Sequence, residues 1–150
     1  MSKQLYLKSL LLGVVFSLSW TMSVADDSRD SKPFADVHVV LQLSDQLNEA
    51  VVLDVANNLI KNYGGPDNID IEIVTFGKGV RLMFAGSEHE VRIASLVDNG
   101  VRFYVCDNTL DTIEQKTGVR PVITKHAEYV RAGVARIVDS VAAGYTLVRP

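Results

Sequence analysis

The sequence has one cysteine, one tryptophan and few aromatic residues, and it carries no excess of positive charge. A single cysteine excludes an internal disulfide framework. Aromatic residues make up 7% of the chain and 18 acidic residues face 15 basic ones, so neither base stacking nor phosphate binding is favoured. We therefore predict no nucleic-acid partner, and the same balance argues against an anionic membrane surface.

Residues 1–25 have the pattern of a cleaved secretory signal peptide. Lys3 and Lys8 give a positive start, an apolar stretch follows, and Ser23 and Ala25 occupy the small-residue cleavage positions. The apolar stretch is shorter than the roughly 20 residues that span a bilayer, which disfavours a retained anchor. We expect a periplasmic protein with no membrane segment after cleavage, in which a flexible, solvated leader at 26–35 precedes one domain at 36–150.

Within this domain, apolar strand-like runs alternate with helical runs. Strands are expected at 37–43, 69–76, 101–106, 122–124 and 145–148. Helices are expected between 45 and 64 and at 88–98, 109–116 and 127–143, with a short helical turn at 80–84. Such alternation predicts right-handed crossovers between parallel strands. The expected fold is a three-layer α/β/α sandwich with a mainly parallel sheet of about five strands, whose order the pattern does not give.

The lone cysteine, Cys106, ends a strand-like run and directly precedes a helix start. Open α/β folds bind their ligands at this carboxyl edge of the sheet. The N–H groups of the next helix favour a thiolate there, whereas the neighbouring carboxylate of Asp107 disfavours it. The alternative is an inert packed thiol, because free cysteine is among the most commonly buried residue types.

Other candidate residues are expected near the same edge. His126 follows the 122–124 strand and could approach Cys106 if the two strands are neighbours; the alternative is a surface histidine. Asn108 and Thr109 are expected to cap the helix that follows Cys106. A capping residue beside a reactive sulfur could serve both the helix end and the sulfur. The loop Gly77-Lys78-Gly79 could approach an anion, the alternative being a plain turn that needs positive φ.

Three stretches together resemble the DsrE/DsrF-like family of sulfur-metabolism proteins: 71–80, 100–110 with Cys106, and the glycine-tyrosine ending at 142–150. The resemblance implies a small α/β protein that forms homo-oligomers, usually trimers or hexamers. In one branch of that family a cysteine carries sulfur as a persulfide between relay proteins. The family's cysteine position matches Cys106 approximately, and the export signal distinguishes this chain from the cytoplasmic relay members.

Two hypotheses about function follow. In the first, this is a periplasmic sulfur-handling protein, at most a sulfurtransferase, in which Cys106 carries sulfane sulfur as a persulfide from a donor to an acceptor protein. In the second, it is a non-enzymatic, oligomeric small-ligand-binding module in which Cys106 is structural. A hydrolase or oxidoreductase is less favoured, since G-x-S-x-G and G-x-G-x-x-G motifs are missing. The scattered histidines predict no metal site, and no cofactor is expected.

Overall fold

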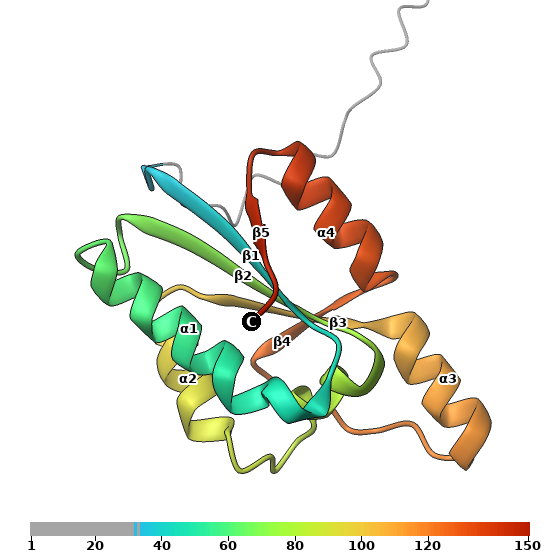
Figure 1. The fold of residues 1–150 in the computed structure, drawn as a ribbon. Coiled ribbons are helices and arrows are strands. Elements are labelled where there is room, and N and C mark those ends of the chain that lie inside the picture. The colour runs from blue at the N-terminus through green and yellow to red at the C-terminus, as the bar shows by residue number, and fades with distance from the viewer. Residues whose placement is uncertain (1–31, 33) are drawn as a thin grey trace, which may run out of the picture. The chain divides into compact units, whose positions relative to one another are not determined.

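The computed structural model describes Lys32 and residues 34–150, so the predicted signal peptide lies outside the described residues. In chain order, the elements are β1 (Val37–Leu43), η2 (Gln46–Asn48), α1 (Glu49–Asn62), β2 (Ile69–Thr75), η3 (Gly77–Met83), α2 (Glu90–Asp98), β3 (Arg102–Cys106), α3 (Asp107–Thr117), β4 (Ala127–Val130), α4 (Gly133–Ala142) and β5 (Thr146–Val148). Here η denotes a short 3-10 helix. Figure 1 shows their arrangement.

The five strands of the described region form one sheet in the order β4-β3-β2-β1-β5, and every neighbouring pair is parallel. The central strand β2 pairs with β1 along its full length, from Val37 opposite Ile69 to Leu43 opposite Thr75. Both β1 and β2 are rich in β-branched residues, which suit a strand buried on two faces. The predicted α/β sandwich with about five parallel strands is confirmed.

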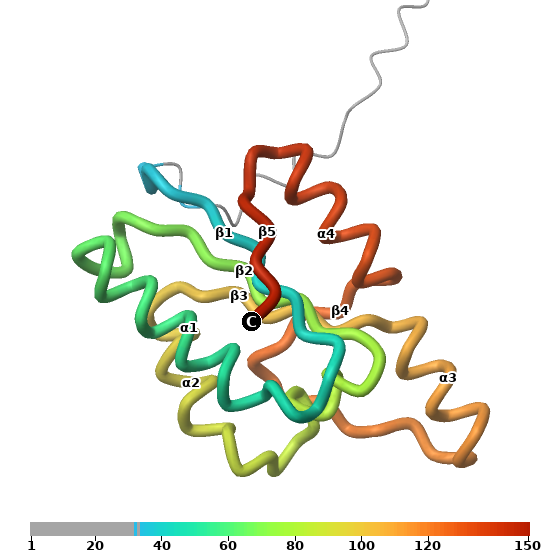
Figure 2. Tube along the Cα trace, in the orientation of Figure 1, coloured from blue at the N-terminus to red at the C-terminus, as the bar shows by residue number. Residues whose placement is uncertain are grey.

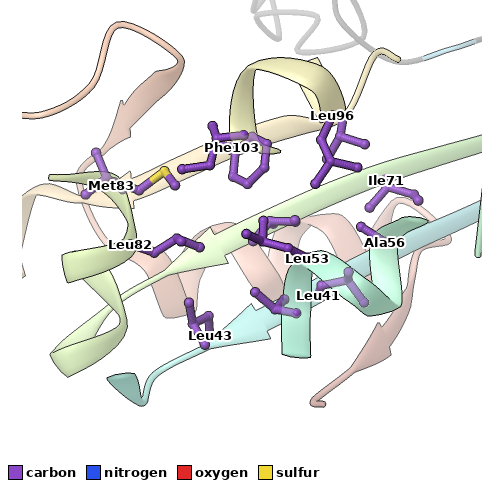
Figure 3. Close-up of a cluster of buried hydrophobic side chains, with 14 of the residues drawn as sticks. Leu41, Leu43, Leu53, Ala56, Ile71, Leu82, Met83, Leu96 and Phe103 are labelled. Atoms are coloured by element: carbon purple, nitrogen blue, oxygen red, sulfur yellow. The ribbon is translucent and has the colours of Figure 1, made fainter. Parts of the chain in front are cut away.

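The larger apolar core lies between one face of the sheet and helices α1, α2 and α3. Leu53 and Ala56 lie three residues apart on α1, so they share one face and pack towards the strands. In Figure 3, these side chains lie beside Leu41 and Ile71 of the sheet, with Phe103 of β3 also in the cluster. Burying such side chains supplies most of the free energy that holds the domain together.

The opposite face of the sheet is covered by α4 (Figures 1 and 2). Ile137 of α4 packs against Val40, Val74 and Tyr104, which form a smaller buried cluster. A single crossover helix reaches this face because the chain returns from β4 at one edge to β5 at the other. The layer on this face of the sheet therefore consists of the single helix α4.

The expected strand at 122–124 is wrong. Ile123 makes only an isolated antiparallel bridge to Phe84, and β4 lies later, at 127–130. The helix predicted from residue 127 accordingly begins at Gly133. Val130 has helical spacing to Val134, which explains the error, yet its backbone pairs with the end of β3 instead. The pairing of β4 with β3 therefore outweighs the helical spacing of the apolar residues around Val130.

Part of the predicted flexible leader packs on the domain. Ala35 is 7% exposed and its N–H donates to the carbonyl of Lys32 at 3.1 Å. The Lys32 backbone N–H in turn donates to Asp70 Oδ2 at 3.1 Å. The expectation of a solvated segment without a packing role is therefore wrong for Lys32 and Ala35, because the buried carboxylate of Asp70 provides a partner that the local sequence does not reveal.

Candidate functional site

Cys106 lies at the point where the chain leaves two neighbouring strands for opposite faces of the sheet. After β3 the chain enters α3, whose Leu110 joins the core shared with α1 and α2. After β4 it enters α4, whose Ile137 packs on the other face. Ligand crevices of open parallel sheets lie at such switch points, outside the carboxyl ends of the strands. Cys106 is the last residue of β3 and pairs with Val130 at the end of β4.

The Cys106 side chain is directed towards α4. Tyr104, two residues earlier on β3, belongs to the cluster on the α4 face, and alternate strand residues share a face. A Cβ placed on Gly133, the first residue of α4, would lie 3.3 Å from Cys106 Cβ and 3.2 Å from Phe76 Cβ. Glycine at 133 therefore allows the helix start to approach the cysteine closely. Cys106 is 6% exposed in this arrangement.

The prediction that Asn108 and Thr109 cap the helix is wrong, because α3 begins earlier, at Asp107, and Cys106 is its N-cap residue. Both residues instead connect neighbouring loops. The Asn108 backbone N–H donates to the Arg131 carbonyl at 3.2 Å, and Thr109 Oγ1 accepts from the Gly77 N–H at 3.2 Å. They hold the carboxyl ends of β2, β3 and β4 together around the cysteine.

The glycines of the Gly77-Lys78-Gly79 loop are explained by close packing against the end of β1. Gly77 has a φ of 56°, and a Cβ there would lie 3.2 Å from the Ser44 carbonyl oxygen. At Gly79 an added Cβ would overlap the backbone carbonyl of Leu43. The expected positive φ is found at Gly77 and not at Gly79, and both glycines belong to the 3-10 helix η3. Lys78 is exposed at this edge.

The carboxylate of Asp107, beside the cysteine, is paired with two arginines. It forms ion pairs with Arg120 and, at 3.5 Å, with Arg131. The same arginines bind Asp111 one helical turn later, at 2.6 and 3.0 Å. Hydrogen bonds from Arg120 and then Arg131 lower the pKa of Asp111. Arg120 also pairs with Glu114 at 3.2 Å, so three carboxylates share two guanidinium groups, and the charge of Asp107 is only partly offset.

His126 is not a partner of Cys106, although β3 and β4 are neighbours as that prediction required. It immediately precedes β4, whose first residue, Ala127, pairs with Phe103, whereas Cys106 pairs with Val130 at the far end. At about 3.3 Å per residue, the two side chains belong to opposite ends of the strand pair. The misplaced fourth strand is the reason for the error.

A buried polar cluster on the α4 face escaped the sequence analysis. Asp70 and Glu72 project from β2 and are 0% and 2% exposed. Arg102 reaches Asp70 Oδ1 at 2.8 Å and Glu72 Oε1 at 3.0 Å, while Arg136 of α4 reaches Glu72 Oε1 at 2.6 Å. The signal was visible as an acidic residue at every second position of an isoleucine-rich strand. We call these four side chains the ionic cluster.

The ionic cluster also anchors the segment after α4. The Tyr145 hydroxyl donates to Asp70 Oδ2 at 2.6 Å and accepts from Arg102 Nη2 at 2.9 Å. Burial tends to raise the pKa of Asp70, but hydrogen bonds from Arg102 and Tyr145 outweigh it and hold that pKa below 3.8, its ordinary value. Burial, followed by the charge of Glu72, raises the pKa of Tyr104 to about 12. Asp70 is therefore ionised at neutral pH, and its bond from Tyr145 fixes the start of the last segment.

Taken together, these features define an α/β protein with a lone cysteine at its switch point. No protein-family model and no curated protein match the chain. Among solved structures, the chain is similar to MTH1491, a protein of unknown function from Methanobacterium thermoautotrophicum. The two are 26% identical over 77% of this chain and 100% of that one, with a TM-score of 0.65.

The described residues lack two further features. Residues 32 and 34–150 include no helix with the length and apolar character needed to cross a membrane. Across the same residues, His, Cys, Asp and Glu side chains form no group of three that could hold a metal ion.

Proposed function

We propose that this protein is an exported, DsrE/DsrF-like sulfur carrier in which Cys106 holds sulfane sulfur as a persulfide. The observation that carries the proposal is the position of Cys106 at the switch point between β3 and β4. The ion pairs of Asp107 with Arg120 and Arg131 support it, since they offset part of the negative charge beside the thiol. The periplasm is the proposed location, from the signal-peptide pattern at 1–25.

The chemistry needs only the one thiol. The Cys106 thiolate attacks the sulfane sulfur of thiosulfate or a polysulfide, an S–S bond forms to Cys106, and sulfite or the shortened polysulfide leaves with the electron pair. An acceptor thiolate then attacks the outer sulfur and Cys106 leaves as the thiolate. No external oxidant is consumed. Because Cys106 is 6% exposed, the cycle requires the first turn of α4 to move aside for donor and acceptor.

Intact mass measurement tests the proposal directly, because Cys106 is the only cysteine. The mature protein is incubated anaerobically with thiosulfate or polysulfide and weighed, with Cys106→Ser as the matched control. We expect the mass of one sulfur atom on the wild type and none on C106S, and dithiothreitol should remove it. An unchanged wild-type mass, or an equal gain on C106S, would exclude the carrier role.

The burial of Cys106 favours a second candidate, a small-ligand-binding module in which the thiol is packing. Its side chain lies at the start of α4 beside Gly133 and is 6% exposed, and such an environment also suits an inert cysteine. Thiol-reagent kinetics separate the two functions. A carrier labels in the folded state at mildly acidic pH, whereas a packing thiol labels only after denaturation.

We further propose that the protein is a homo-oligomer, a trimer or hexamer, assembled through α4. Val134, Val138 and Val141 lie at helical spacing on its outer side and are 56%, 60% and 45% exposed. Leaving such a stripe in water is unfavourable, and a second copy would cover it. Light scattering should give a multiple of the monomer mass for the wild type and a smaller species for Val138→Lys. A wild-type monomer at micromolar concentration would contradict this assembly.

A further inference from the structure

The ammonium group of Lys32 lies among three backbone carbonyls at the amino edge of the sheet. Lys32 Nζ donates to the carbonyl oxygens of Pro66 at 2.5 Å, Asn99 at 2.9 Å and Ile69 at 3.3 Å. Pro66 belongs to the connection before β2, Ile69 begins β2, and Asn99 belongs to the connection before β3. A lysine ammonium has three N–H donors, and here each has a carbonyl partner. We call these three oxygens the carbonyl cage.

Glycine at position 100 leaves room for the Lys32 side chain beside the carbonyl cage. A Cβ placed on Gly100 would lie 2.5 Å from Lys32 Cε and 2.8 Å from Nζ, so a residue with a side chain at 100 would displace it. The main chain is held as well, since the Lys32 N–H donates to Asp70 Oδ2 at 3.1 Å. Side chain and backbone of one residue thus bind separate parts of the amino edge.

The electrostatics of the cage suit a single positive charge. Its ligands are neutral carbonyl dipoles, which are the groups that replace the hydration shell of a monovalent cation. Divalent cations, in contrast, take carboxylates as ligands in most proteins. Burial lowers the pKa of Lys32, while Asp70 and Asp67 oppose that change and Arg102 adds to it. The site therefore offers a single positive charge neutral oxygen ligands together with the nearby carboxylates of Asp70 and Asp67.

We propose that the carbonyl cage is a monovalent-cation site of this domain, that the Lys32 ammonium is its built-in occupant, and that loss of this side chain opens the site to free ammonium ion. This inference is independent of Cys106 and of the proposed sulfur chemistry. It gives Lys32 a definite role, since its ammonium group joins the connections before β2 and β3 at this edge.

Thermal unfolding of Lys32→Ala in the mature protein tests the site. Losing three hydrogen bonds to a charged group should lower the Tm by roughly 5–10 °C. Ammonium chloride at about 0.5 M should then raise the Tm of K32A by about 3 °C more than that of the wild type. Tetramethylammonium chloride, which has no N–H group and is too large, should not. Lys125→Ala, at an exposed position, is the matched control.

Two results would overturn the inference: a K32A protein that melts with the wild type, or an equal response of both proteins to ammonium. If K32A does not fold, Lys32→Gln takes its place, because it keeps most of the stem and carries no charge. K32Q should melt below the wild type, and a wild-type Tm for K32Q would also refute the site. A double-mutant cycle with Gly100→Ala adds a check, because the added methyl should cost less once Lys32 is gone.

Discussion

Replacing Tyr145 by phenylalanine removes one hydroxyl from the ionic cluster and keeps the ring. That hydroxyl donates to Asp70 Oδ2 at 2.6 Å and accepts from Arg102 Nη2 at 2.9 Å. A hydrogen bond to a charged group contributes about 1.5–3 kcal/mol. Arg102 keeps its ion pairs with Asp70 and Glu72, so losing the second bond adds little. We expect the free energy of unfolding to fall by about 2 kcal/mol at pH 7.

The pH dependence of this loss identifies its cause. Hydrogen bonds from Arg102 and Tyr145 hold the pKa of Asp70 below its ordinary 3.8 in the folded protein, against the effect of burial. A carboxyl with a depressed folded pKa stabilises the protein above its unfolded pKa, and this contribution is lost as the pH falls through the folded value. Protonation of Asp70 weakens the bond that the variant lacks. The difference between wild type and Y145F should therefore shrink below about pH 3.8.

Urea denaturation followed by far-UV circular dichroism measures both effects, since the only tryptophan, Trp20, belongs to the predicted signal peptide. Tyr129→Phe is the control, because Tyr129 is 59% exposed and its hydroxyl should contribute little. A loss under about 0.5 kcal/mol for Y145F at pH 7 would refute the reasoning. So would a full loss that persists at a pH low enough to protonate Asp70 in the folded protein.

Two more predictions concern the carboxyl edge. Gly79→Ala should lower the free energy of unfolding by about 2 kcal/mol or more, because its Cβ would overlap a backbone carbonyl of β1. Gly86→Ala, where nothing lies within 4 Å, should lose about 1 kcal/mol through its positive φ alone, and equal losses in urea would contradict the packing argument. Arg120→Ala should slow alkylation of folded Cys106 about threefold by leaving Asp107 less neutralised, and the variant should remain folded because the ion pair is at the surface. An unchanged alkylation rate would show that this ion pair does not influence the thiol.

The sequence predicted the fold well because β1, β2 and β3 are buried on both faces. Continuous β-branched runs such as 37–43 have few other stable arrangements, and the helices between them are amphipathic. The fourth strand was missed for the opposite reason. Ala127–Val130 is short, lies at the sheet edge and is followed by a helix whose apolar spacing already begins at Val130. Only its pairing with β3 distinguishes it from a helical turn.

Predictions about the candidate site depended on how local each interaction is. Cys106 was correctly placed at a strand end, because that placement follows from its own neighbours in the chain. The role of Thr109 was not, since its hydroxyl accepts from Gly77, 32 residues away in sequence. The ionic cluster was missed on similar grounds, because acidic residues in a central strand are tolerated only when distant arginines meet them. No local sequence pattern indicates that these acidic residues pair with the distant arginines.

The ionic cluster and Cys106 are connected through α4. Arg136, at the end of the first turn of that helix, and Ser140, in its last turn, both bind Glu72, at 2.6 and 2.7 Å. The first residue, Gly133, approaches Cys106 without a polar contact to it. Charge-assisted bonds to Glu72 therefore begin within the first turn of α4, at Arg136, and continue at Ser140 one turn later, while Gly133 meets Cys106 by van der Waals contact. Moving the first turn away from the thiol would loosen the bond from Arg136 to Glu72 and leave the bond from Ser140 in place, so a partner that reaches Cys106 must displace part of this anchorage.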